Sequence, residues 1–233
     1  MTQDPASRPA ATGSGEPPAW LTALAAATGQ MQVPAPLLPP AGQGRPAAVL
    51  ILFAETADRG PDLLLVRRSA TLRNHAGQPA FPGGAIDNSD GGPVQAALRE
   101  AAEETGLAPD SVDVVAVLPE MYIWRSDFRV IPVLGWWHSP GPVAPGDLAE
   151  IESVHRIGVA DLADPANRLT IRYPGGRSGP AFRVGGLLVW GFTAMLLDRV
   201  LALGGWERPW DAGHLTELPD GGQPTGWPGA PAS

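Results

Sequence analysis

Residues 64–107 read LLVRRSATLRNHAGQPAFPGGAIDNSDGGPVQAALREAAEETGL. Their second half joins a glycine-rich loop, residues 81–84, to a segment whose apolar residues recur with the period of a helix, and Gly106 provides a helix end. One face of this helix carries Val94, Ala97, Leu98, Ala101 and Thr105, and a face roughly opposite carries Glu100, Glu103 and Glu104. We therefore expect one face to pack against the core and the other to gather three carboxylates.

The three glutamates repel one another, because like charges three or four positions apart on a helix destabilise it by about 0.2–0.5 kcal/mol per pair. No Lys or Arg lies four residues beyond any of them. A bound Mg²⁺ or Mn²⁺ ion would offset this repulsion, since hard divalent cations prefer oxygen ligands. From these residues alone, a solvated acidic helix face is the alternative interpretation.

The order of glycine-rich loop, helix and Arg-Glu-x-x-Glu-Glu-x-Gly resembles the Nudix box, the signature of the Nudix hydrolases. Its second half is matched position by position by Arg99, Glu100, Ala101, Glu103, Glu104, Gly106 and Leu107. The first half departs from the pattern, because Gly84 lies one residue too far from Arg99 and Gly91 stands where the box has Glu. The nearest acids are Asp87 and Asp90.

An upstream signature resembles the branch of this family that hydrolyses coenzyme A, in which the box is relaxed. The signature is reproduced by Leu64, Leu65, Arg68, Ser69, Leu72, Arg73, His75, Gly77, Phe81, Pro82, Gly83 and Gly84, with Val66 where Thr is usual. The resemblance is close over residues 64–107 and looser over 46–203. It implies an α/β fold, a Nudix-type α/β/α sandwich with a mixed sheet. The implied activity is hydrolysis of coenzyme A or acyl-CoA to 3′,5′-ADP and 4′-phosphopantetheine or its acyl derivative.

The resemblance also implies roles for the box residues. Glu100, Glu103 and Glu104 would hold the Mg²⁺ or Mn²⁺ ions, and Arg99 would orient the glutamates, so Arg99, Glu103 and Glu104 are the expected catalytic residues. Divalent ions neutralise the diphosphate oxygens and polarise the attacking water. The family takes its general base from the box or from an acid on a distant loop, which leaves Glu103, Glu120, Glu150 and Glu152 as candidates.

Substrate binding is expected from a basic cluster and from the glycine-rich loop. The cluster comprises Arg67, Arg68, Arg73 and His75, and Arg suits the diphosphate and 3′-phosphate of coenzyme A because it forms paired hydrogen bonds. Backbone N–H groups of Gly83 and Gly84 could add phosphate contacts. Exposed charges at a strand end, and a plain turn, are the alternatives. Aromatic stacking on an adenine and simple burial explain four tryptophans equally well, namely Trp124, Trp136, Trp137 and Trp190.

A chain of 233 residues suits one domain flanked by terminal segments of biased amino-acid composition. We expect a disordered tail over residues 1–18, a Pro-rich lead-in over 19–45 with a short helix near Trp20, a Nudix hydrolase domain over 46–205 and a loose tail over 206–233. No signal peptide is recognisable, so we expect a cytoplasmic protein. The net charge of −8 argues against nucleic-acid or membrane partners, and the lack of cysteine excludes thiol catalysis.

Apolar runs predict the elements that flank the box. Residues 47–53 and 62–66 suggest a hairpin, and further strands are expected at 112–118, 121–124, 128–136, 150–157, 169–172 and 182–189, with helices at 159–162 and 190–203. Residues 187–203 are apolar enough to raise a membrane-spanning interpretation. Asp198 and Arg199 interrupt them, and their length is at the short limit for a span, so we expect a buried helix.

Two other functions are left open by the sequence. One is a broader hydrolase of nucleoside diphosphates linked to another group, such as ADP-ribose or NADH. The other is a nucleotide-binding sensor without turnover, against which the intact acids of the box argue. The expected partner is a small-molecule substrate, and a homodimer is open because many Nudix proteins dimerise.

Overall fold

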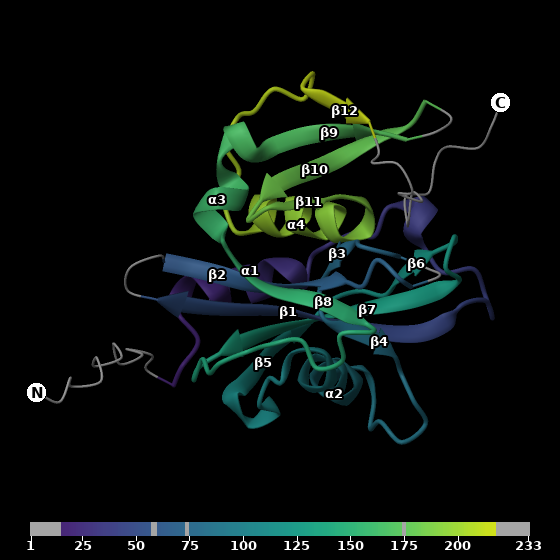
Figure 1. Cartoon of the computed structure of the whole chain (residues 1–233), viewed down its shortest axis with the longest axis vertical. Helices are drawn as coiled ribbons and strands as arrows, with labels where there is room; N and C mark the ends of the chain where they lie inside the picture. Colours follow the sequence, from purple (N-terminus) through teal and green to yellow (C-terminus); the bar gives the residue numbers. More distant parts are fainter. Residues whose placement is uncertain (1–14, 57–59, 73–74, 174–175, 218–233) are drawn as a thin grey trace, which may run out of the picture.

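A mixed sheet of eight strands lies at the centre of the computed structural model, which describes residues 15–56, 60–72, 75–173 and 176–217 (Figure 1). β1 and β7 run parallel, and the other pairs of this sheet are antiparallel. The main path is β3 (Pro79–Ala80), β2 (Gly60–Arg68), β1 (Arg45–Thr56), β7 (Phe128–Trp137) and β5 (Val112–Val117). Shorter pairings add β4 (Gly83–Ala85) to β1, β6 (Met121–Ile123) to β7 and β8 (Ile151–Gly158) to β2.

The two faces of β1 bury different side chains, because successive residues of a strand point to opposite faces. Ile51 and Phe53 join the cluster that includes residues of α1 (Ala19–Thr28) and α4 (Gly191–Leu203). Leu50 and Leu52 join the cluster formed with α2 (Pro93–Thr105). The sheet therefore lies between helices, and the predicted α/β/α sandwich with a mixed sheet is confirmed (Figure 1).

α2 begins and ends as its sequence predicts. Pro93 occupies the first turn, where its missing N–H costs nothing, and Gly106 ends the helix in the left-handed region with φ of 70°. The segment 138–150 covers this end: the backbone N–H of Gly146 donates to the carbonyl of Glu104 at 3.0 Å. A Cβ on Gly146 would collide with the carbonyl oxygen of Glu103, so this close approach requires glycine.

A second sheet, which the sequence analysis did not predict, lies beyond α4 (Figure 1). Its order is β11 (Leu187–Val189), β10 (Ser178–Val184), β9 (Arg168–Arg172) and β12 (Leu215–Glu217). The stretch 182–189, expected as one extended segment, turns back at Gly185 and Gly186, whose φ values are 56° and 75°. Two short helices between β8 and β9 join the sheets, namely α3 (Val159–Ala163) and η3 (Pro165–Asn167), and η2 (Pro109–Ser111) connects α2 to β5.

Segments that precede and follow the central sheet in the sequence pack against the hydrophobic core. Leu21 and Leu24 of α1 are buried there, followed by η1 (Ala35–Leu37), so the helix predicted near Trp20 is confirmed and is longer than expected. Two parts of residues 206–217, where a loose tail was expected, make ordered contacts. Trp206 packs edge-on against Trp20 at 5.3 Å between ring centroids, and β12 pairs with β9. Residues 1–14 and 218–233 lie outside the described residues.

The apolar helix α4 is buried, as the sequence predicted. Leu197 and Leu201 are nearly inaccessible, and Asp198, which interrupts the apolar run, pairs with the buried Arg168 of β9. The ion pair explains why a charge lies on this helix, because an unpaired guanidinium in the core would be costly. No helix in the described part of the chain is long and apolar enough to cross a membrane.

Candidate active site

The carboxylate of Glu104 lies buried between α2 and the signature loop. Only 6 % of its side chain is exposed; Oε2 accepts a hydrogen bond from the backbone N–H of Gly83 at 3.0 Å, and Oε1 lies 3.3 Å from Nη1 of Arg68. Burial, reinforced by repulsion from Glu100 and Glu150, raises the pKa of Glu104 to about 7, although Gly83 and Arg68 act in the opposite direction. Carboxyl groups perturbed in this way are typical of functional sites.

The carboxylate of Glu100 lies against Gly84, the next residue of the same loop. A Cβ on Gly84 would come within 2.5 Å of the Glu100 carboxylate, so only glycine allows this approach. Burial raises the pKa of Glu100, and nearby Glu103 and Asp87 add to the effect, while Arg99 opposes it. Glu100 and Glu104, one helical turn apart, therefore both border the glycine-rich loop.

Arg99 joins the helix to the segment that follows this loop. Its Nε and Nη2 each donate to the carboxylate of Asp90 at 2.9 Å, and Nη2 also donates to the carbonyl of Ala85 at 3.1 Å. Its Nη1 donates to Glu100 at 3.0 Å and to Glu103 at 3.1 Å. Asp90, one residue before the Gly91 that replaces the Glu of the box, thus supplies a carboxylate to the box arginine.

The expectation that all three carboxylates lie on the face opposite the core is wrong for Glu104. Glu104 belongs to the buried face, whereas the side chain of Glu103 is 60 % exposed. The helix packs through small residues such as Ala97 and Ala101, which leave room for glutamate side chains beside them. No three His, Cys, Asp or Glu side chains within the described ranges form a group able to hold a metal ion.

The two glutamates at the loop nevertheless have the chemistry that a hard divalent cation requires. Glu100 and Glu104 offer oxygen donors, and burial raises the pKa of each because it disfavours the charged form, which a bound cation would stabilise. Arg99 lowers the pKa of Glu100 and Arg68 lowers the pKa of Glu104, but burial has the larger effect on each. Glu103 could join such an ion only from the exposed side of the helix.

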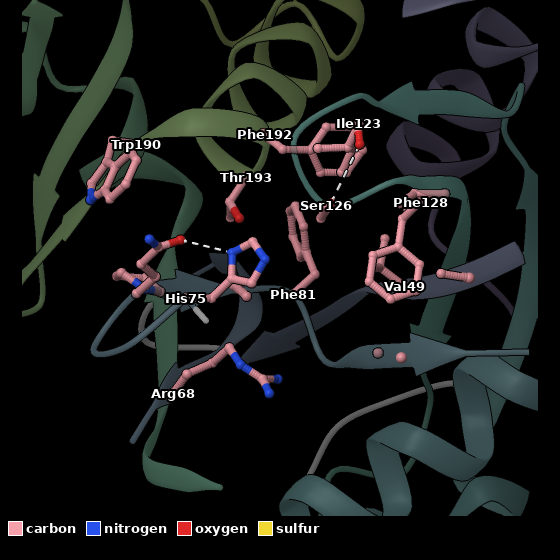
Figure 2. A pocket seen from close by; sticks show the side chains of 17 residues that line it. Val49, Arg68, His75, Phe81, Ile123, Ser126, Phe128, Trp190, Phe192 and Thr193 are labelled. Carbon is pink, nitrogen blue, oxygen red and sulfur yellow. Dashed lines mark hydrogen bonds between the residues drawn. The ribbon is translucent and has the colours of Figure 1, made fainter. Parts of the chain in front are cut away.

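A pocket of about 230 Å³ lies on the other side of the glycine-rich loop (Figure 2). Gly83 and Gly84 form part of its wall, so one short strand separates the pocket from the carboxylates. Most of the lining is apolar, and it comes from four parts of the chain: Ala47 and Val49 of β1, Phe81 of the signature, Ile123, Phe128 and Val130 near β6 and β7, and Trp190 and Phe192 at α4.

The structure divides the basic cluster expected at the substrate site. Arg68 and His75 line the pocket together with Gly83 and Gly84. Arg67 does not line it and lies 3.4 Å from Glu152 instead, because strand residues alternate between faces. The β2–β8 pairing also shifts register between Arg67 and Arg68. Arg73 lies outside the described residues.

Some pocket residues carried no signal in the sequence. Phe128, Phe192 and Thr193 are far from the box in the chain, and no spacing connects them with it. Among the tryptophans, Trp190 lines the pocket, Trp136 and Trp137 are core residues, and Trp124 is 47 % exposed outside it. Contacts between residues far apart in the sequence therefore determine which aromatic side chains line the pocket.

The four candidates for the general base occupy different surroundings. Glu120 lies 3.6 Å from Arg129, Glu152 pairs with Arg67 and Glu103 pairs with Arg99. Glu150 has no ion pair among the residues that the structure describes, and its charge acts on buried Glu104. It follows the segment that docks on the end of α2, so the fold brings this acid toward the box.

Comparison with known proteins shows what this chain is similar to. A family model described as the NUDIX domain matches residues 44–173. The uncharacterized Nudix hydrolase NudL of Cronobacter sakazakii is 41 % identical over 175 residues, which cover 71 % of this chain and 85 % of that protein. The NudL of Klebsiella aerogenes is 49 % identical over 106 residues, which cover 46 % of this chain and 85 % of that protein. RenU, a Nudix hydrolase from M. smegmatis, has a similar fold, with a TM-score of 0.51 and 19 % identity over 74 % of this chain and 99 % of its own.

Proposed function

The chain belongs to the Nudix hydrolases, enzymes that act on phosphoanhydride bonds, and from that premise we propose that it hydrolyses the diphosphate of coenzyme A or acyl-CoA. The products would be 3′,5′-ADP and 4′-phosphopantetheine, free or acylated. The observation that carries the proposal is the contact between the two motifs: Gly83 and Arg68 of the upstream signature both bind Glu104 of the box. The cytoplasmic location expected from the sequence stays a prediction.

Arg68 is suited to hold the substrate diphosphate beside the carboxylates. Its Nη1 faces Glu104, while its Nε is buried and has no hydrogen-bond partner among the described residues. An unsatisfied guanidinium donor is costly, and a phosphate oxygen would satisfy it. Gly83 and Gly84 line the pocket next to Arg68, so their backbone would lie beside a diphosphate held there.

Nudix hydrolases generally use divalent metal ions, and we propose that Glu100 and Glu104, with Glu103, hold Mg²⁺ or Mn²⁺ here. When bound, such ions neutralise diphosphate charge and increase the acidity of water. Arg99 would keep Glu100 and Glu103 in place through its hydrogen bonds and is thus a positioning residue. Arg68 would fix the diphosphate so that water reaches phosphorus opposite the leaving group.

We propose Glu150 as the general base, because this exposed carboxylate is near enough for its charge to raise the pKa of Glu104 and has no ion-pair partner in the described ranges. Glu150→Gln is expected to lower kcat by about 10²-fold with little change in KM, since general-base catalysis typically contributes 10²–10⁴-fold. Steady-state kinetics with coenzyme A measure this. Glu152→Gln, which removes only an exposed pair with Arg67, is the matched control and should keep the wild-type rate. Equal kcat values in the two variants would exclude Glu150.

The substrate proposal predicts a preference that one panel can measure. Coenzyme A and acetyl-CoA should exceed ADP-ribose, NADH and 8-oxo-dGTP in kcat/KM by about tenfold or more, equivalent to about 1.4 kcal/mol of transition-state binding. Products should be identified by mass spectrometry as 3′,5′-ADP and phosphopantetheine species. A preference for ADP-ribose or NADH would indicate the broader hydrolase, and tight binding without turnover in Mg²⁺ would indicate a sensor.

A further inference from the structure

The pocket beside the diphosphate site is built by two parts of the chain. The strands and loops of the matched domain, residues 44–173, supply one wall. Trp190, Phe192 and Thr193, at the start of α4, lie beyond that match and supply the opposite wall (Figure 2). The second wall is therefore an addition to the part of the fold that carries the box.

Thr193 is the polar residue of this added wall. It is only 8 % exposed, and Figure 2 shows its side chain pointing into the pocket. Its hydroxyl makes no hydrogen bond to the residues that the structure describes, and it is not one of the fully buried unpaired polar atoms, so it is open to the pocket. A hydroxyl open to an otherwise apolar pocket can donate to or accept from a ligand atom.

His75 faces Thr193 from the signature wall (Figure 2). Its Nδ1 lies 3.2 Å from Oε1 of Gln78, and an amide oxygen can only accept, so Nδ1 carries the hydrogen. Burial and nearby Arg68 lower the pKa of His75, which favours a neutral ring with Nε2 as an acceptor. The backbone of His75 has φ of 58°, a conformation that non-glycine residues rarely adopt and that a surrounding structure must impose.

From this arrangement we infer that Thr193 and His75 recognise an amide group in an otherwise apolar chain of the substrate. The N–H and C=O of a trans amide point in opposite directions, so one amide between the two walls can donate to His75 and accept from Thr193. The aromatic and aliphatic lining suits the methylene and methyl groups on either side. The inference rests on the proposed function, because the pantetheine arm of coenzyme A is a chain of this kind.

A phosphate at the same position fits the residues less well. Arg68, the arginine among the described residues that line the pocket, pairs with Glu104 toward the box, and a neutral His75 adds no positive charge. Most of the remaining lining is aromatic or aliphatic, which would desolvate an anion without compensating it. The geometry therefore assigns the diphosphate to the Arg68 end and the amide to the Thr193 end.

A substrate pair and two variants test the inference. Coenzyme A is compared with a 3′-phosphorylated ADP ester whose alkyl chain has the length of the pantetheine arm but no amide. Thr193→Val keeps the side-chain shape and should lower kcat/KM for coenzyme A by about tenfold, the value of one buried hydrogen bond, with the alkyl ester changed less than twofold. Thr193→Ser, which keeps the hydroxyl, should restore most of the loss. Thr22→Val on the exposed side of α1 is the matched control.

The outcomes separate this inference from the proposed function. If wild-type protein cleaves coenzyme A well and Thr193→Val lowers both substrates equally or neither, the amide assignment is wrong while the function stands. If wild-type protein cleaves neither coenzyme A nor acetyl-CoA, the proposed function fails first. A greater loss on ADP-ribose than on coenzyme A in Thr193→Val would assign the pair to ribose hydroxyls and overturn the inference. Circular dichroism and melting temperature establish that each variant is folded.

Discussion

Glu104→Gln is expected to lower kcat by roughly 10²-fold or more, in the range that the loss of a preorganised electrostatic contact produces. The change keeps the shape of the side chain and an oxygen that can accept the hydrogen bond of Gly83. It removes the negative charge that would hold a divalent ion. We therefore expect a larger effect on turnover than on the free energy of unfolding. Burial raises the pKa of Glu104 to about 7, so the negative charge that the variant removes is destabilising in the metal-free protein.

Thermal unfolding in Mg²⁺ provides a second measurement for the same variant. A ligand that binds only the folded state stabilises it by RT ln(1 + [L]/Kd), so the melting temperature of wild-type protein should rise with Mg²⁺ concentration. That rise should be largely lost in Glu104→Gln. Glu207→Gln, on an exposed loop, is the matched control and should behave as wild type in both measurements. A near-wild-type kcat in Glu104→Gln would refute its role as a ligand.

Local patterns were sufficient to predict the central elements. The helical period and terminal Gly106 marked α2, and apolar runs marked the β1–β2 hairpin and α4, because the spacing of apolar residues within a segment indicates which of its faces is buried, whatever that face packs against. The second sheet was missed for the converse reason. β12 is three residues long and pairs with β9, a strand far away in the chain, so nothing local indicates the pairing.

The candidate site shows the same division between local and long-range information. The motif match predicted that Glu104, Arg68 and Gly83 belong to one site, and the structure brings them into contact. Glu104 was assigned to the wrong face, although it follows buried Ala97 by seven residues and so lies only about 20° from it on a helical wheel; periodicity itself places Glu104 beside the packed face. Thr193 could not be found at all, since its place opposite His75 depends on how α4 folds back.

The adjacent glycines of the loop should respond differently to the same substitution. In Gly83→Ala the new Cβ would meet the backbone oxygen of Ala48 and the Cα of Val49, and φ at this position is 156°. Backbone of an inner strand cannot yield cheaply, so we expect a loss of about 2–3 kcal/mol in the free energy of unfolding. The melting temperature should fall by roughly 5–10 °C for a chain of this size.

In Gly84→Ala the three atoms nearest to the new Cβ all belong to the carboxylate of Glu100, the end of a flexible side chain, at 2.5–2.6 Å. Glu100 can swing away, so the melting temperature should change by less than about 3 °C, equivalent to roughly 1 kcal/mol. The displaced carboxylate would no longer lie beside Glu104, and kcat should fall about tenfold or more, with a weaker response of the melting temperature to Mg²⁺. Unchanged turnover in a stable Gly84→Ala protein would show that the place of Glu100 against the loop is irrelevant to catalysis. Because the two variants add the same methyl group one residue apart, a loss of stability in the first and of turnover in the second would separate the loop's contribution to folding from its contribution to the site.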